Sequence, residues 1–436
     1  MNKLFFFWGE LKSTFWFIPV LMIVIAIGMA LGFLYWDNHL EIKQDGIAAF
    51  LFVGSSDSAR IILSTISGAM ITVAGTVFSI TLVALTLASS QFGPRLIRNF
   101  MYDRINQVVL GSYISTYIYC LIVLNTITGE DQTGYIPALS ILVALIAALA
   151  NIILLIVFIH HIAVSIQAGK VTSGITKTLF KNIQTLYPEK LGVESEEEQE
   201  VKEALVKSNF KFSTTMSVHE NGYLQYVDHD SLVKVVSQLN SLFEIHHRPG
   251  SYIVKGEALG MFYTDHLLND PVIKKIQSNF IMGESRTLQQ DTEHSIHQMV
   301  EIASRALSPG INDPYTTIAC IDNLTSIMSY LSSVRLPSKY RYDKNERLVI
   351  IAETLTFEGM LDAAFNQIRQ FSKNSPAVVI RLMEALVTID RLATSNRHKK
   401  ALKKHAEMVL NMAENSFSEP NDLKDLKERS RLISGL

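Results

Sequence analysis

The sequence predicts an α-helical integral membrane protein with four transmembrane helices and a cytoplasmic α+β region. In that region a small β-rich domain is expected to precede an all-α C-terminal domain. Two observations lead to this prediction. Long uncharged apolar runs fill the chain before about Ile166, and charged residues alternate with apolar ones after it. A run of about 20 apolar residues is what a helix needs to cross a bilayer.

Four spans are expected, each long enough to cross a membrane, at residues 15–36, 61–92, 108–127 and 136–159. They form a transmembrane domain of residues 1–165. After it we expect a connecting helix or linker at 166–209, the β-rich domain at 210–265 and the helical domain at 266–436. The first span ends in Tyr35-Trp36, which is typical of the membrane interface. It is therefore interpreted as a membrane helix, not as a signal peptide, whose apolar region is shorter.

Positively charged residues gather at alternate ends of the spans. One side carries Lys3, Lys12, Arg95, Arg98, Arg104, Lys170, Lys177 and Lys181, whereas the other carries Lys43 and Arg60. Loops rich in Lys and Arg stay on the cytoplasmic side of a membrane. We therefore expect both termini, and the whole C-terminal half, to be cytoplasmic.

The second span is the most unusual stretch of the chain. It has no charged residue between Ile61 and Phe92, and as a helix it would be about 48 Å long, against a hydrocarbon core of about 30 Å. Small or hydroxylated side chains recur along it, at Ser64, Gly68, Thr72, Gly75, Thr76 and Ser79. Such a stripe either allows close helix packing or lines a narrow wet path, and both interpretations stay open. Gln91, Arg95 and Arg98 would form its cytoplasmic mouth, where the arginines could attract anions.

Charge and composition argue against several classes of function. No Asp, Glu, Lys or Arg lies inside a span, which argues against a proton-coupled pump. The amides of Asn125 and Asn151 are expected to form hydrogen bonds between helices. A net charge of -2 gives no reason to expect nucleic-acid binding. The two cysteines, Cys120 and Cys320, lie far apart and predict neither a disulfide nor a cysteine-based metal site.

The β-rich region is predicted from two short strings. FSTTMSVHENGYLQYVD has β-branched and aromatic residues around Asn221-Gly222, which predicts a β-hairpin. RPGSYIVKGEALG predicts two short strands separated by Gly256, a pattern similar to small barrel-sandwich domains. An acidic run, ESEEEQEVKE, precedes both and is interpreted as a solvated linker. From Asp270 onward the chain is expected to be helical throughout.

Residues 283–317 are the densest in side chains that could carry chemistry. Asp291, His294 and His297 are candidate metal ligands, but the two histidines are three residues apart, about 60° off one line along a helix, whereas known motifs place two histidines four apart. No third ligand close in sequence supports them. No metal and no cofactor is therefore predicted. Arg305, Asn312 and Asp313 flank a sharp turn, in which Asp313 would cap the next helix and Arg305 would brace the corner. The alternative is a ligand-binding or gating loop. No catalytic motif is present, so the protein is not expected to be an enzyme.

Several strings together resemble a known family. They are QFGPRLIRNFMYDRINQVVLGSY, GYLQYVD, RPGSYIV, and RTLQQD followed by RALSPGINDPYTT. With them the chain resembles, over nearly its whole length, a family of bacterial predicted membrane proteins, domain of unknown function 2254. The resemblance implies four N-terminal membrane helices and a cytoplasmic C-terminal region, and hence a multi-pass protein of a bacterial inner membrane. It implies no activity.

The resulting functional hypothesis is a homo-oligomeric channel- or transport-like protein with a cytoplasmic regulatory region. Its expected partners are the lipid bilayer, further copies of itself and a small ion or small-molecule ligand, but no nucleic acid. The alternative is a membrane-anchored cytoplasmic module, without a pore, that senses a ligand or acts as a scaffold. These hypotheses differ in whether the second span lines a shared axis or only packs.

Overall fold

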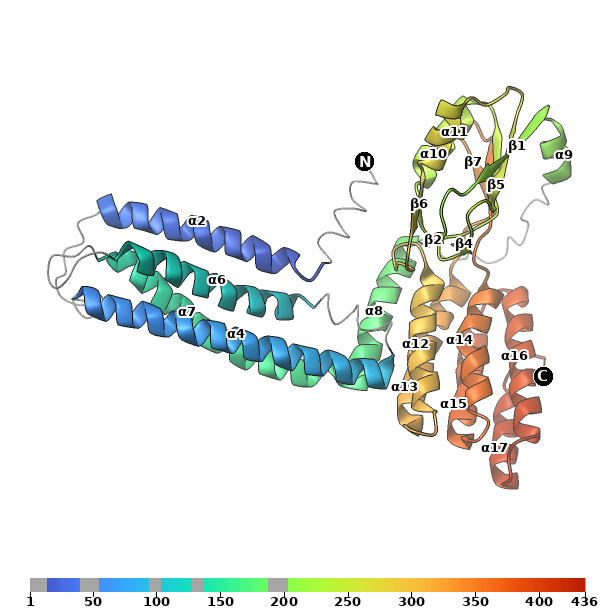
Figure 1. Ribbon diagram of the computed structural model, residues 1–436. Coiled ribbons are helices and arrows are strands. Elements are labelled where there is room, and N and C mark those ends of the chain that lie inside the picture. The colour runs from blue at the N-terminus through green and yellow to red at the C-terminus, as the bar shows by residue number, and fades with distance from the viewer. Residues whose placement is uncertain (1–13, 40–54, 94–102, 128–135, 187–202, 436) are drawn as a thin grey trace. The chain divides into compact units, whose positions relative to one another are not determined.

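The computed structural model describes residues 14–39, 55–93, 103–127, 136–186 and 203–435 (Figure 1). The chain divides into two compact units, Met1–Lys170 and Val171–Leu436. Each unit is described by itself below.

Within its described residues, the first unit has four helices that are long and apolar enough to cross a membrane. They are α2 (Phe17–His39), α4 (Ser56–Phe92), α6 (Arg104–Thr126) and α7 (Ala138–Ser165). The four predicted spans all fall on these helices. α4 begins five residues earlier than predicted because Ser55 caps it, accepting a hydrogen bond from the Ser58 amide at 3.2 Å.

Helix α6 holds the first unit together. It contacts α2, α4 and α7, and it is the most buried of the four. α2 and α6 lie close together at Gly111, where a Cβ would lie 3.0 Å from the Pro19 backbone. Only glycine allows that approach, since any side chain would force the two helices apart.

Hydrogen bonds between polar groups join α6 to α7 and α2 to α7. The Asn151 side chain on α7 accepts a hydrogen bond from Ser112 at 2.6 Å and donates one to Thr116 at 2.8 Å, both on α6. The interhelical role predicted for Asn151 is thus confirmed, whereas Asn125 is exposed. Asp37, one residue beyond the predicted first span, belongs to α2 and accepts hydrogen bonds from the first amides of α7, including that of Ser140 at 2.9 Å.

The second unit combines two sheets with a group of helices. Its strands are β1 (Phe212–Ser217), β2 (Gly222–Val227), β3 (Leu242–Ile245), β4 (Tyr252–Ile253), β5 (Ala258–Thr264), β6 (Phe280–Gly283), β7 (Tyr340–Tyr342) and β8 (Leu348–Ala352). Its shorter helices are α9 (Glu203–Ser208), α10 (His229–Gln238) and α11 (Asp270–Gln277). Its longer helices are α8 (Ala168–Leu186, which begins in the first unit), α12 (Thr292–Ala306), α13 (Pro314–Ser333), α14 (Phe357–Phe371), α15 (Pro376–Leu392), α16 (Asn396–Glu414) and α17 (Pro420–Ser430).

One sheet has the order β1-β5-β3-β8-β7 and the other β4-β2-β6. All pairs are antiparallel except β3 and β8, which run parallel. The core of this part contains Phe243 and Phe262, both fully buried, and helix α10 contributes Leu232 to it. Helices α12 to α17 stand side by side, with the strands gathered beyond one end of them (Figure 1).

Two predictions about this unit are wrong. β1 and β2 both form around Asn221-Gly222, but they do not pair as a hairpin, because β1 pairs with β5 and β2 with β4 and β6. The chain is also not helical throughout after Asp270, since β6, β7 and β8 all follow it. The predicted strands on either side of Gly256 are confirmed as β4 and β5.

Candidate functional site

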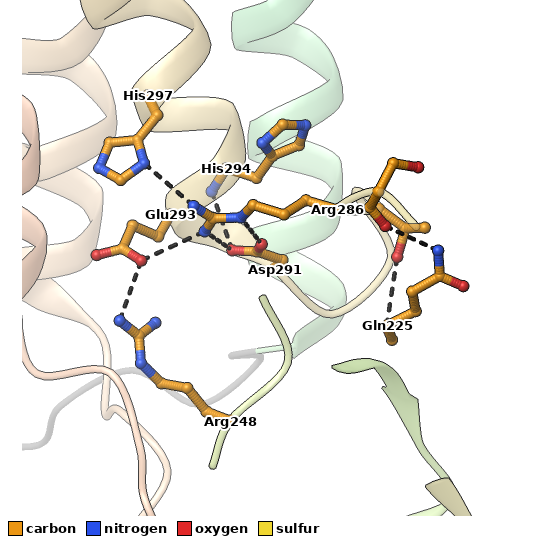
Figure 2. A network of polar contacts seen from close by, with 9 residues as sticks. Gln225, Arg248, Arg286, Asp291, Glu293, His294 and His297 are labelled. Carbon is orange, nitrogen blue, oxygen red and sulfur yellow. Dashed lines mark hydrogen bonds and ion pairs between the residues drawn. The ribbon is translucent and has the colours of Figure 1, made fainter. Parts of the chain in front are cut away.

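A network of polar contacts in the second unit lies at the start of α12 (Figure 2). It brings together Gln225 from β2, Arg248 and Gly250 from the loop after β3, and Arg286 from the segment between β6 and α12. These residues come from three parts of the sequence. The network therefore links the β-rich part of the unit to its helices.

At the centre of the network, Arg286 forms an ion pair with a buried carboxylate. Arg286 Nε donates to Asp291 Oδ2 at 2.6 Å and Nη2 donates to Oδ1 at 2.8 Å, a two-pronged pairing that fixes both side chains. The Asp291 side chain is 1% exposed, and it also caps α12 by accepting from the His294 amide at 3.0 Å. Burial alone would lower the pKa of Arg286, yet the hydrogen bonds and charges of Asp291 and Glu293 raise it above its usual value. The guanidinium is therefore charged throughout the physiological range.

A second acid and a second arginine extend the pair. Glu293 Oε2 lies 3.4 Å from Arg286 Nη2 and accepts a hydrogen bond from Arg248 Nη2 at 3.0 Å. His297 Nδ1 lies 3.4 Å from Arg286 Nη1. Two guanidinium groups thus face two carboxylates, so the network is balanced in charge and each acid is held by an arginine.

Gly250 allows the loop after β3 to reach this pair. Its φ is +97°, and a Cβ there would lie 2.3 Å from Asp291 Oδ2. Any other residue at this position would strain the backbone, and its side chain would clash with the buried carboxylate. The glycine of the string RPGSYIV is thus explained by the close approach of backbone to ion pair.

Hydrogen bonds hold the segment before α12 against β2. Gln290 both accepts from the Val227 amide at 2.9 Å and donates to the Val227 carbonyl at 3.1 Å. Gln225 donates to the Ser285 carbonyl at 2.7 Å. The two glutamines of RTLQQD and GYLQYVD therefore hold one chain segment against the other.

Three of the strings noted in the sequence meet in this network. A family model described as "Predicted membrane protein (DUF2254)" matches residues 12–388, which is most of the chain. The chain belongs to this family. The uncharacterized proteins Mb1321c of Mycobacterium bovis and Rv1290c of Mycobacterium tuberculosis are each 29% identical to it over 419 residues, covering 94% of this chain and 78% of theirs. No solved structure matches the chain.

Helix α8 connects the network to the chain that follows α7. Its apolar face, Ile175, Leu179 and Ile183, is buried. Asn182 donates to the Leu288 carbonyl at 3.0 Å, within the segment that carries Arg286, and Thr176 donates to Asn323 of α13 at 2.8 Å. The segment before α12 is thus held from two sides, by β2 and by α8.

The residues considered as metal ligands are occupied in other ways. Asp291 pairs with Arg286, His297 lies beside the same guanidinium, and the His294 amide completes the cap of α12. Within the described ranges, no group of three or more His, Cys, Asp or Glu side chains is arranged to hold a metal ion.

The predicted corner lies at the other end of α12 and is not part of the network. Asp313 caps α13, as predicted, by accepting from the Thr316 amide at 3.1 Å. Asn312 takes a left-handed backbone with φ +49°. The Arg305 guanidinium lies 3.9 Å from the Glu301 carboxylate, one turn earlier on α12. This contact lies within α12 and does not reach the corner.

The stripe of the second span lies on the outside of the first unit. Ser64, Gly68, Thr72, Gly75, Thr76 and Ser79 are all exposed in the single chain. Gln91 is exposed near the end of α4. Arg95 and Arg98, the other residues predicted for the mouth, lie outside the described residues.

The sequence prediction missed Arg248, Gly250, Arg286 and Glu293 as members of one site. The sequence does contain a signal, because RPGSYIV and RTLQQD are both strings that resemble the family. RPGSYIV contains Arg248 and, two residues on, Gly250 with its positive φ. RTLQQD contains Arg286 and, at its end, Asp291, which caps α12. A search for arginines that need buried acidic partners would have linked Arg286 to Asp291, five residues on.

Proposed function

We propose that this protein is a homo-oligomeric, channel-like membrane protein in which α4 of one copy meets α4 of another. The observation that supports it is the direction of the α4 stripe. A Cβ added at Gly68 or Gly75 would have no heavy atom of another described element within 4 Å. Among the residues that the structure describes, the stripe is therefore not used for packing inside one chain.

The opposite face of α4 supplies the packing within the chain. Its buried residues include Leu63, Met70, Ala74 and Val77, and they face α6 and α7. At 3.6 residues per turn, the centre of the stripe lies about 180° round the helix from these residues. A helix that has one face buried and small residues on the other presents a surface suited to close approach by a second copy.

The hydroxyl groups of the stripe are compatible with a bilayer. Thr72, Thr76 and Ser79 each donate to a carbonyl one turn earlier in α4, at 2.8, 3.2 and 2.9 Å. Their donors are thus satisfied without a neighbour, as a hydrocarbon environment requires. Their oxygens can still accept hydrogen bonds, from water in a shared path or from another copy.

The orientation predicted from charge belongs to the same proposal. Both termini and the second unit are placed in the cytoplasm of a bacterial cell, with the transmembrane helices in its inner membrane. The end of α4 that carries Gln91 then forms a cytoplasmic mouth, and Arg95 and Arg98 follow it in sequence. Positive charge there would favour the entry of anions.

Substitution of Gly75 tests the proposal. We expect Gly75→Leu to abolish ion flux through protein-containing liposomes, because the new side chain would fill the space where two α4 helices approach or where the path runs. Thr72→Ala should alter flux or selectivity but leave assembly intact, since hydrogen bonds between membrane helices average only about 0.6 kcal/mol. Flux is measured in liposomes, and the oligomeric state by light scattering in detergent.

Gly28→Leu is the matched control. Gly28 lies on α2 and also has open space around its Cβ position, so the same change is made on a helix outside the stripe. It should leave flux and mass unchanged. A monomeric parent protein that conducts no ion under any gradient would contradict the proposal.

A second candidate function is a membrane-anchored sensing module without a pore. It is favoured by α8, which follows α7 after a short turn and is hydrogen bonded to the segment that carries Arg286. A monomeric, non-conducting protein whose second unit binds a ligand would support this candidate instead of the first.

A further inference from the structure

An open cleft of about 250 Å³ lies between α14 and α16, away from the network described above. The α14 side carries two acids, Glu358 and Asp362. The α16 side carries three basic residues and a histidine: Arg397, Lys400, Lys404 and His405. The cleft is therefore lined almost entirely by ionisable side chains.

Both acids of the cleft already have partners. Arg397 Nε lies 2.7 Å from Glu358 Oε1, and His405 Nε2 lies 3.0 Å from Asp362 Oδ1. In the part of the chain that the structure describes, no ion pair is formed by Lys400 or Lys404. Two ammonium groups, one helical turn apart, thus border the cleft without an acidic partner.

The position of these charges is unfavourable for α16 itself. Its first nine residues contain Arg397, Lys399, Lys400, Lys403 and Lys404, and its first acid is Glu407. Positive charges near a helix N-terminus oppose the helix dipole, and like charges at i and i+4 repel each other. An anion between Lys400 and Lys404 would offset the repulsion between these two charges.

A further cation lies close by on α14. Burial is the main reason that the pKa of His405 is lowered, and the charges of Arg369 and Lys404 add to that lowering, so both lie near the imidazole. Arg369 Nε is buried and has no hydrogen-bond acceptor among the described residues. Arg369 lies two turns beyond Asp362 on α14, outside the lining of the cleft itself.

We propose that this cleft binds a small, soluble, phosphate-bearing molecule, with Lys400 and Lys404 as its main contacts and Arg397 beside them. Phosphate groups are compact and multiply charged, which matches closely spaced ammonium and guanidinium groups. The cleft is smaller than the 300–1,000 Å³ typical of pockets that enclose whole ligands. It therefore holds the phosphate part, and the rest of the molecule extends into solvent.

This inference does not depend on the assembly of α4. Its test uses the full chain in nanodiscs of uncharged phosphatidylcholine, with inorganic pyrophosphate as the probe and titration calorimetry at fixed ionic strength. We expect saturable binding of one pyrophosphate per chain. Lys400→Gln with Lys404→Gln should weaken binding by at least about tenfold, because two charge-assisted contacts are lost.

Two further variants make the test specific to the cleft. Lys274→Gln with Lys275→Gln removes the same charge from exposed lysines of α11 and should change affinity less than about twofold. Ala401 lines the cleft, so Ala401→Phe should block binding while every charge is kept. Hydrogen exchange of α14 and α16 confirms that each variant is folded.

Three results would overturn the inference. They are the absence of saturable binding to the parent protein, an equal loss of affinity in the two lysine pairs, and unchanged binding in Ala401→Phe. Binding of phosphatidylglycerol vesicles that depends on Lys400 and Lys404, without binding of pyrophosphate, would assign the cleft to lipid headgroups instead of a soluble molecule.

Discussion

Asp291 is the most demanding side chain of the network, because its carboxylate is almost wholly removed from water. A buried charge is tolerated only when it is paired and hydrogen bonded. Arg286 supplies two hydrogen bonds and the opposite charge, and the His294 amide supplies a third hydrogen bond. Removing the arginine therefore does more than delete a contact, since it leaves an acid buried alone.

We expect Arg286→Met to destabilise the start of α12 by about 3–5 kcal/mol, the usual cost of breaking a buried ion pair on one side. Hydrogen exchange of the α12 peptides in the full chain measures the loss. Arg286→Met with Asp291→Asn should recover part of it, because no charge is left buried and asparagine still caps a helix. Arg381→Met is the control, since Arg381 and Asp322 are both 43% exposed and such a pair contributes about 0–1 kcal/mol. Equal losses in Arg286→Met and Arg381→Met would contradict the structural role given to Arg286.

His405 makes the stability of the helices depend on pH. Burial lowers its pKa below the usual value, so the unfolded chain takes up a proton at a higher pH than the folded chain does. Stability is therefore lost as pH falls from the unfolded pKa toward the folded one, and it changes little above that window. We expect the protection of α14 and α16 to fall between about pH 7 and pH 5.

His405→Gln should reduce this dependence, because glutamine does not titrate. Hydrogen exchange of the parent and the variant is compared at the same pH, which removes the intrinsic effect of pH on exchange. His219→Gln, at an exposed position in the β-rich part, is the control and should behave as the parent. If His405→Gln lost as much protection on acidification as the parent does, another group would control the effect.

At the scale of single elements, the sequence predicted helices better than strands. The membrane helices follow from unbroken apolar runs, and the turn before Pro314 correctly marks a helix start. The predicted starts of α4 and α6 are less accurate. Ser55 and Asp103, which lie in polar stretches, cap these helices through side-chain hydrogen bonds and start them earlier than predicted. A local pattern indicates that a helix is present but does not show which polar residue caps it.

Strand pairing depends on residues far apart in the sequence, and this is why the hairpin prediction failed. Asn221-Gly222 is a good turn, yet β1 and β2 separate into different sheets. β8 lies parallel to β3, although about a hundred residues separate them. The apolar string LVIIA is typical of a buried strand, but the helical pattern of the residues around it predicts a helix there.

The same limit applied to the network. Arg286 and Asp291 are close in sequence, but Arg248 and Gly250 approach them only because β3 and the segment after β6 belong to neighbouring parts of the fold. The strings that carry these residues were recognised without their contacts. What the sequence could not supply was the three-dimensional proximity that turns four separate residues into one site.

For the molecule as a whole, the distribution of charge predicts how the chain crosses the membrane. Basic residues cluster at the N-terminus, after α4 and after α7, whereas Lys43 and Arg60 alone occupy the other side. Four helices place those three clusters on one face of the bilayer. Because basic loops are retained in the cytoplasm, this face should be the inner one.

Cysteine labelling of intact cells tests that orientation. Cys120 and Cys320 are both buried and are replaced by Ala to give a cysteine-free parent. We expect a membrane-impermeant maleimide to label Asp45→Cys and Asp131→Cys, at positions outside the described residues, from the exterior. Lys177→Cys, on the exposed face of α8, should react only after the cells are permeabilised, and Lys274→Cys on α11 should behave in the same way. Labelling of Lys177→Cys in intact cells would place the second unit outside and rule out four helices with both termini in the cytoplasm. It would also move the proposed phosphate-binding cleft away from the soluble phosphorylated molecules of the cell interior, so this one measurement bears on the topology and on the ligand together.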